Sequence, residues 1–163
     1  MEIKNKIQEA INKQINAELY SSYLYLAMSA FFEENNWRGF AHWMRIQANE
    51  ENTHAMKLFD YLLERSGKVI LEDIKAPKKD WKTPLDVFEA VYKHEVKVTQ
   101  LINELLNLAR QEKDYATESI LKWFIDEQVE EEANAKKILE KLKLIKDSVN
   151  GLFILDHELG ERK

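Results

Sequence analysis

Apolar residues recur every three or four positions along most of the chain, which is the spacing that lines one face of an α-helix. No segment shows the strict alternation of apolar and polar residues that is typical of a half-buried β-strand. The sequence therefore predicts an all-α protein. The expected helices are four long ones and a short fifth, over residues 3–33, 37–65, 84–111, 115–145 and 148–159.

Turn and capping residues separate these blocks. A polar turn over residues 33–36 follows the first block, and a Ser-Gly pair at 66–67 ends the second. Thr83 followed by Pro84 is typical of a helix start, since proline at the first helical position sacrifices no hydrogen bond. Asp114 is expected to cap the fourth helix.

The lengths of the connections predict how the helices are joined. Short links between the first and second helices, and between the third and fourth, predict two antiparallel hairpins. The middle link, residues 67–83, lacks a helical period and can reach roughly 55 Å when extended. A helix of about 28 residues spans only about 42 Å, so this link can run the length of the bundle. We therefore predict a four-helix bundle with one long crossover and parallel second and third helices.

Each long helix carries residues of metal-ligand type within its apolar stripe. Every one of them lies roughly a dozen residues into its helix, so the predicted arrangement brings them to one level of the interior. Two pairs repeat a three-residue spacing, which keeps both members on the same face. The candidate ligands are Glu18, Glu51, His54, Glu95, Gln128 and Glu131.

A single glutamate on an apolar stripe is more often a boundary residue whose carboxylate reaches water. Four carboxylates buried together would each cost several kcal/mol unless protons or cations neutralised them. The conjunction of four helices therefore favours a buried metal pair, with a carboxylate such as Glu51 as the bridge. This oxygen-rich set suits iron or manganese, admits zinc, and includes no thiolate, because the chain has no cysteine.

Spacing alone leaves open the assignment of other polar residues near this level. The acidic run 126–132 is ordinarily a solvated face, and Glu50, Glu127 and Glu130 are either exposed or part of an adjoining site. Tyr25 lies seven residues after Glu18, where core packing with a satisfied hydroxyl is favoured over a redox role. The remaining histidines and most aromatic residues are not expected to take part in the site, among them His42, His94, His157, Trp43 and Trp123.

Composition narrows the class of protein. The length of 163 residues and 45% hydrophobic content fit a single globular domain. The formal charge of −5 provides no basic surface, so we expect no nucleic-acid partner and no attraction to an anionic membrane. No long apolar run or signal-like leader is present, and a cytoplasmic protein is expected.

The ligand set, in this order and on these helices, resembles the non-haem ferritins of bacteria and archaea. The resemblance spans residues 1–163 as one ferritin-like domain, with the bundle over 1–145 and a short C-terminal helix and tail over 146–163. It implies a di-iron centre. One iron would be held by Glu18, Glu51 and His54. The second iron would be held by Glu51, Glu95 and Glu131, with Gln128 beside it.

The same resemblance implies a third, outer iron position formed by Glu50, Glu127, Glu130 and Glu131, and it places Tyr25 close to the centre. It further implies a shell of twenty-four identical subunits that oxidises Fe(II) with O2 or peroxide and stores ferric mineral inside. The C-terminal block, with Leu152, Leu155 and Leu159 on one side, would then pack at a symmetry axis. The alternative is a helix folded back on its own bundle.

Two departures from related di-iron proteins matter. Oxygenases, rubrerythrins and bacterioferritins repeat Glu-x-x-His on the fourth helix, whereas this chain has Gln128-x-x-Glu131, which fits iron in transit better than a permanent cofactor. Asn52 follows the bridging glutamate where a bacterioferritin has its haem-binding methionine, so no haem is expected. A di-iron oxygenase or peroxidase that retains its metals, and a bundle with no enzymatic role, remain the alternatives.

Overall fold

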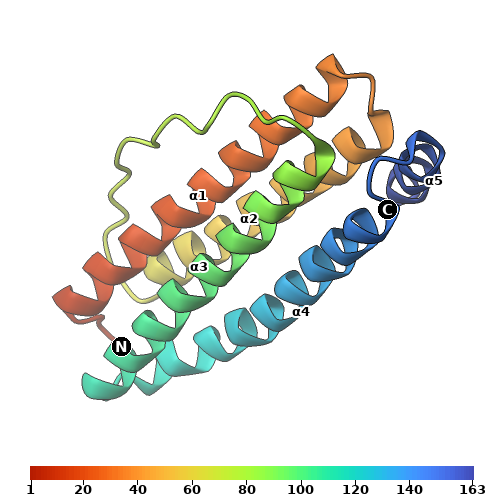
Figure 1. Cartoon of the computed structure of the whole chain (residues 1–163). Helices are drawn as coiled ribbons and strands as arrows, with labels where there is room; N and C mark the ends of the chain where they lie inside the picture. Colours follow the sequence, from red (N-terminus) through yellow and green to blue (C-terminus); the bar gives the residue numbers. More distant parts are fainter.

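The computed structural model describes all of residues 1–163 and contains five helices and no strand (Figure 1). Each helix begins and ends within a few residues of its predicted bounds, so the all-α prediction is confirmed. None of the five combines the length and apolar character needed to cross a membrane. The helices are α1 (Asn5–Glu34), α2 (Arg38–Glu64), α3 (Pro84–Gln111), α4 (Tyr115–Ile145) and α5 (Val149–Gly160).

The predicted helix caps are present. The Thr83 hydroxyl accepts a hydrogen bond from the backbone N–H of Asp86 (3.1 Å), and Pro84 occupies the first helical position. The Asp114 carboxylate accepts from the N–H of Thr117 (3.1 Å) at the start of α4. These side chains satisfy backbone donors that have no partner within the helix, and they fix where α3 and α4 begin.

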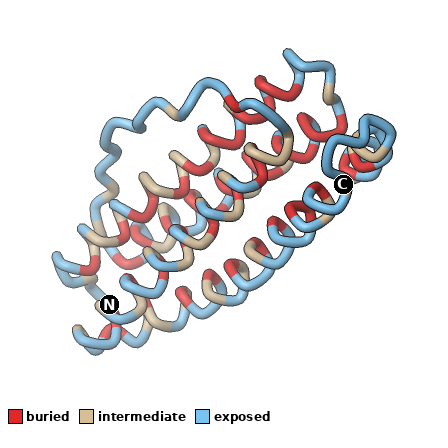
Figure 2. Tube along the Cα trace, viewed as in Figure 1, coloured by how far each residue is buried: buried red, intermediate tan, exposed pale blue.

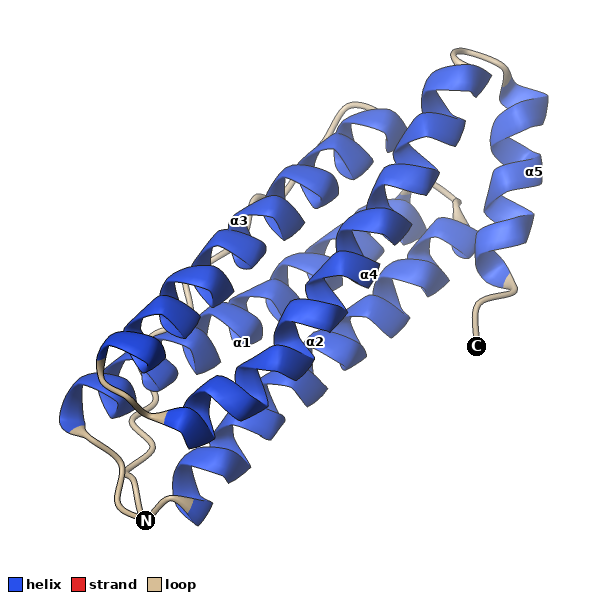
Figure 3. Ribbon diagram, turned by 90° about the horizontal axis from the view of Figure 1, so that it is seen from below, coloured by secondary structure: helices blue, strands red, loops and turns tan.

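An ion pair between the end of α2 and the start of α4 shows the helix directions. Arg65, at the end of α2, donates to both carboxylate oxygens of Asp114 at the start of α4 (3.0 and 3.1 Å). Because α3 ends where α4 begins, α2 and α3 finish at the same end of the bundle and run parallel (Figures 1 and 3). The predicted bundle with one long crossover is therefore confirmed.

The crossover lies along α1, where asparagine side chains bind its backbone. Asn12 Nδ2 donates to the Lys68 carbonyl oxygen (2.9 Å), and Asn12 Oδ1 accepts from the N–H of Ile70 (2.8 Å). One turn later Asn16 Nδ2 donates to the carbonyl oxygen of Asp73 (3.2 Å). These bonds satisfy backbone N–H and carbonyl groups of a loop that has no secondary structure of its own. Figure 1 shows the loop running lengthwise beside α1.

The buried apolar side chains form two clusters with a polar layer between them. One cluster, towards the α5 end, includes Phe32, Phe40 and Phe88, and the other includes Ile11 and Ile102. Along every long helix the candidate ligands fall between residues of the first cluster and residues of the second. Figure 2 shows the buried positions following the inward faces of the helices. The interior polar layer is therefore built into an otherwise apolar core.

The fifth helix folds back on the end of its own bundle. Leu155 and Leu159 are buried in the same cluster as Phe40, so this side of α5 packs against its own bundle. A place for α5 at a symmetry axis stays a prediction. The contact with α2 requires Gly39, because a Cβ atom there would lie 1.6 Å from the carbonyl oxygen of Asp156. The Asp156 carboxylate in turn accepts from the N–H of Phe40 (3.0 Å).

Candidate metal centre

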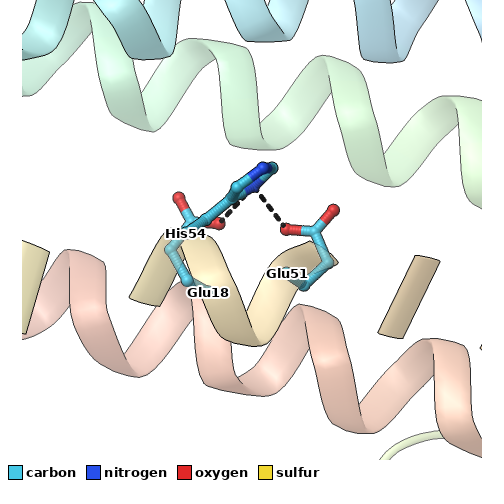
Figure 4. A group of neighbouring side chains, drawn as sticks. All are labelled: Glu18, Glu51 and His54. Carbon is cyan, nitrogen blue, oxygen red and sulfur yellow. Dashed lines mark ion pairs between the residues drawn. The ribbon is translucent and has the colours of Figure 1, made fainter. Parts of the chain in front are cut away.

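Glu18, Glu51 and His54 converge from α1 and α2 on one point of the interior. His54 Nδ1 lies 3.3 Å from Oε2 of Glu51 and 4.0 Å from Oε2 of Glu18 (Figure 4). All three side chains are buried, and Glu18 Oε2 has no hydrogen-bond partner. An unsatisfied buried carboxylate oxygen is costly, so its position beside two other ligand-type atoms suits a bound cation.

A second group contains Glu51 again, together with Glu95 from α3 and Glu131 from α4. One ligand atom from each of the three lies within 4.8 Å of the others, as is also true of the Glu18, Glu51 and His54 group. All three residues are buried. The two groups share Glu51, so the structure contains two adjacent candidate metal positions with a common carboxylate.

Burial and mutual repulsion disfavour the charged forms of these carboxylates. Desolvation, followed by the neighbouring Glu51, raises the pKa of Glu18 well above its usual value. Desolvation and the charge of Glu95 likewise raise the pKa of Glu51, and they raise the pKa of Glu131 to about 8. The pKa of Glu95 is also raised by burial. Protons or cations must therefore compensate the cluster near neutral pH.

Two buried glutamine side chains orient the ligands. Gln14 Nε2 donates to Oε1 of Glu18 (2.8 Å). Gln47 Nε2 donates to Oε1 of Glu51 (3.2 Å) and to Oε2 of Glu131 (2.7 Å). Neither glutamine was among the predicted site residues. The available signal was spacing, because each precedes a ligand glutamate by four residues and so shares its helix face.

Glu95 is held by two of the predicted site residues. The Tyr25 hydroxyl donates a short hydrogen bond to Oε1 of Glu95, and Gln128 Nε2 donates to Oε2 of Glu95 (3.2 Å). Burial and the nearby Glu95 carboxylate raise the pKa of Tyr25 well above its usual value, so the phenol is neutral. Gln128 also donates to Thr99 Oγ1 (3.2 Å). Both residues thus lie beside the second candidate metal position.

The residues expected at an outer iron position are brought together only in part. His54, Glu127 and Glu131 form a third group of ligand atoms within 4.8 Å, and Glu127 Oε1 lies 3.6 Å from His54 Nε2. Glu50 instead forms an ion pair with Arg162 (2.6 Å). Glu130 is exposed and belongs to none of the three groups.

The histidines and tryptophans assigned no role lie outside these groups. Among them, His94 contacts a predicted site residue: its ring packs edge-on against Tyr25, and its Nε2 lies 2.8 Å from Ser21 Oγ. Burial, with a smaller effect of Lys97, lowers the pKa of His94 to about 4, so its imidazole is neutral. Trp123 packs edge-on against the His54 ring.

The family description of the ferritin-like domain matches residues 8–145, which include every residue of the three ligand groups. The chain belongs to the ferritin family. It is 46% identical over 160 residues to a bacterial non-heme ferritin of Bacteroides fragilis, covering 98% of this chain and 99% of that protein. It is 40% identical over 154 residues to a bacterial non-heme ferritin of Campylobacter jejuni, covering 94% and 92% of the two chains.

Solved ferritin structures have the same fold over nearly the full length. The open pore ferritin of the hyperthermophilic archaeon Archaeoglobus fulgidus superposes with a TM-score of 0.98 at 51% sequence identity, covering 99% of this chain and 98% of that one. The resemblance to non-haem ferritins inferred from the ligand residues is therefore confirmed. The ferritin fold accounts for the crossover and for the docked C-terminal helix as well as for the bundle.

Proposed function

We propose that the protein is an iron-storage ferritin that oxidises Fe(II) at a di-iron centre and keeps the ferric product inside a shell of its own subunits. The observation that carries this proposal is the pair of buried ligand groups that share Glu51. Family membership supports it, since relatives over nearly the whole chain are named bacterial non-heme ferritins. The iron is the substrate and the cargo of the protein.

In the proposed reaction two ferrous ions bind side by side. Glu18 and His54 hold the first ion, Glu95 and Glu131 hold the second, and Glu51 bridges them. Because the pKa values of these carboxylates are raised, binding of the metal ions displaces protons from them. The positive charge of the ions then replaces that of the protons in the buried layer. Gln14 and Gln47 keep the carboxylate oxygens directed at the metal positions.

The two ferrous ions supply the two electrons that reduce one O2 to hydrogen peroxide, or one peroxide to water, with protons taken up from solvent. Carboxylates stabilise the ferric state because they are hard, anionic ligands. At the second position this chain has Glu131 where related enzymes have histidine, and Gln128 where they have glutamate. The Gln128 amide nitrogen donates to Glu95. A weaker ligand set at that position favours release of the product.

Two further roles belong to the same proposal. Tyr25 acts at the centre through its hydrogen bond to Glu95, where a neutral phenol holds the carboxylate in place. Glu127 and Glu131, with Glu50 and Glu130 beside them, form an outer acidic position through which iron passes. The third ligand group, with His54, Glu127 and Glu131, supports the first part of that route.

Exposed apolar side chains support assembly into the proposed shell of twenty-four subunits. Phe153 and Ile154 on α5 are 59% and 71% exposed, and Leu144 and Val149 beside them are 84% and 59% exposed. An apolar surface of this kind, placed at one end of the molecule, favours contact with further copies. The net charge of −5 per chain would draw cations towards such a shell.

The proposal is tested by measuring size and iron capacity together. We expect light scattering to give a 24-subunit particle, and we expect absorbance of ferric iron to rise through many equivalents of Fe(II) per chain. The variant Glu51→Ala, which removes a ligand from both positions, should assemble but oxidise iron far more slowly. A small species that never exceeds two irons per chain would favour a di-iron oxygenase or peroxidase instead.

A further inference from the structure

Arg162, just beyond the end of α5, reaches from the C-terminal segment to the level of the metal centre. Its Nη1 donates to Oε1 of Gln47 (3.0 Å) and to the carbonyl oxygen of Trp43 (3.3 Å). Its Nη2 donates to Oε2 of Glu50 (2.6 Å), and the guanidinium carbon lies 4.5 Å from the centroid of the Trp43 ring. Hydrogen bonds and stacking together fix the plane of the guanidinium group.

The backbone that carries Arg162 is itself anchored to α2. The carbonyl oxygen of Arg162 lies 2.7 Å from Nε2 of His42, and Leu159 is buried against the bundle. Upstream, the tight contact of Gly39 with Asp156 sets how α5 crosses α2. The packing of α5 against α2 therefore determines where the Arg162 guanidinium lies.

The contact with Gln47 determines which way the Gln47 amide points. Its NH2 group donates to Glu51 and Glu131, and its oxygen accepts from Arg162. An amide turned end for end would place its oxygen against two carboxylates and its NH2 group against the guanidinium donor. Both contacts would then be repulsive, so Arg162 favours the orientation that serves the ligands.

We propose that Arg162 is a positioning residue for the metal centre, acting through Gln47 on the Glu51 and Glu131 carboxylates. The proposal rests on the proposed function only in that these carboxylates bind metal. Residues that orient metal ligands typically change metal affinity by about 10- to 100-fold when removed. The same guanidinium also forms an ion pair with Glu50.

The test uses Co(II), which reports ligand geometry in its visible spectrum and does not require the oxidation reaction. The whole protein, freed of metal, is titrated by calorimetry and absorbance as wild type, Arg162→Met and Arg45→Met. Arg45 is an exposed residue of α2, so its replacement removes the same charge from the same region. We expect Arg162→Met to weaken Co(II) binding at the Glu51, Glu95 and Glu131 position about tenfold and to alter the spectrum.

Arg45→Met should behave as wild type. A folded Arg162→Met protein with wild-type affinity and spectrum would overturn the proposal, as would equal losses in both variants. Should Arg162→Met fail to fold, Arg162→Lys takes its place. It keeps the charge but cannot donate to Gln47 and Glu50 through one planar group, so a smaller loss of affinity is expected.

A double-mutant cycle with Gln47→Leu separates positioning from a direct effect of charge. Once Gln47 is absent, replacing Arg162 should cause little further loss of Co(II) affinity, whereas fully additive losses would overturn the proposed route. A wild-type protein that binds Co(II) but neither oxidises nor stores iron would refute the proposed function alone. Wild-type protein that binds no Co(II) at these carboxylates would overturn both.

Discussion

Both ring nitrogens of His54 face carboxylates, and Glu127 provides the one on the solvent side. Nε2 of His54 lies 3.6 Å from Oε1 of Glu127, while Nδ1 faces Glu51 at 3.3 Å. A histidine that binds metal through one nitrogen commonly directs its other nitrogen at a carboxylate. The geometry therefore gives Glu127 a part in orienting His54 in addition to the outer position.

Replacing Glu127 with leucine should weaken the first metal position. Without the Glu127 carboxylate beside Nε2, His54 loses a neighbour that helps to hold its ring, and we expect about tenfold weaker Co(II) binding by the Glu18, Glu51 and His54 group. Glu127→Gln retains an acceptor oxygen and serves as the matched control, with a smaller loss. Calorimetry on the metal-free protein measures both. If Glu127→Leu removed only an additional, weaker binding event, Glu127 would be an outer ligand and nothing more.

The stability of the metal-free protein should fall as pH rises from about 5 to about 8. Burial and Glu95 raise the pKa of Glu131 from 4.5 to about 8, so the folded chain holds this proton more tightly than the unfolded chain does. The resulting stabilisation is complete below the unfolded pKa and is lost as pH rises through the folded one, a change of roughly a few kcal/mol. Glu18, Glu51 and Glu95 act in the same direction.

Thermal unfolding followed by circular dichroism at constant ionic strength measures this dependence. Glu131→Gln cannot ionise, so its midpoint should decline less steeply across the same pH range, although the other carboxylates keep some slope. Saturation with a divalent metal should largely remove the decline in the wild type, because the ions replace the lost protons. A metal-free midpoint that rises between pH 5 and 8 would contradict the assignment.

The variant Tyr25→Phe should slow iron oxidation while preserving metal stoichiometry. The hydroxyl that donates to Oε1 of Glu95 would be absent, and the carboxylate would lose one of the contacts that fix it. Leaving a buried acceptor unsatisfied costs about 1–3 kcal/mol, which should also lower the thermal midpoint of the metal-free protein. Stopped-flow absorbance gives the oxidation rate, and anaerobic calorimetry gives the stoichiometry. Wild-type rates in this variant would remove Tyr25 from the account of the centre.

Gly39→Ala should loosen the fifth helix. Its new Cβ atom would meet the backbone of Asp156, which cannot move aside as a flexible side chain does, so we expect a loss of at least about 1–3 kcal/mol. Gly160→Ala is the milder comparison at the same contact, since its Cβ would lie 3.3 Å from the Cα of Gly39, which a shift of a few tenths of an ångström relieves. Denaturant unfolding compares the two. Equal stability of both variants would show that α5 does not depend on this contact.

Much of the fold follows from local rules that act along one helix at a time. Periodicity predicted the four long helices, and the caps at Thr83 and Asp114 follow from side-chain chemistry within one turn. The candidate ligands followed from the same periodicity. The apolar faces of the helices pack together, so a glutamate on such a face is buried and needs a proton or cation to neutralise it. Length alone predicted that the crossover spans the bundle, although it did not reveal that Asn12 and Asn16 bind its backbone.

Contacts between distant residues were beyond the reach of such rules. Gln47 lies on the α2 stripe, but its role depends on Glu131, 84 positions away. Arg162 reaches Gln47 across 115 positions from a segment whose docking depends on a close backbone contact at Gly39. The spacing of leucines in the last helix likewise fitted both a symmetry axis and its own bundle. Only the three-dimensional packing shows that Leu155 and Leu159 lie against their own bundle.

Sharing of Glu51 by two metal positions in one buried layer can be seen in crystals soaked anaerobically with Fe(II), with diffraction recorded at the iron absorption edge. We expect two anomalous peaks per chain, one among Glu18, Glu51 and His54 and the other among Glu51, Glu95 and Glu131. Iron found elsewhere, or these carboxylates left without metal at saturating Fe(II), would contradict this sharing.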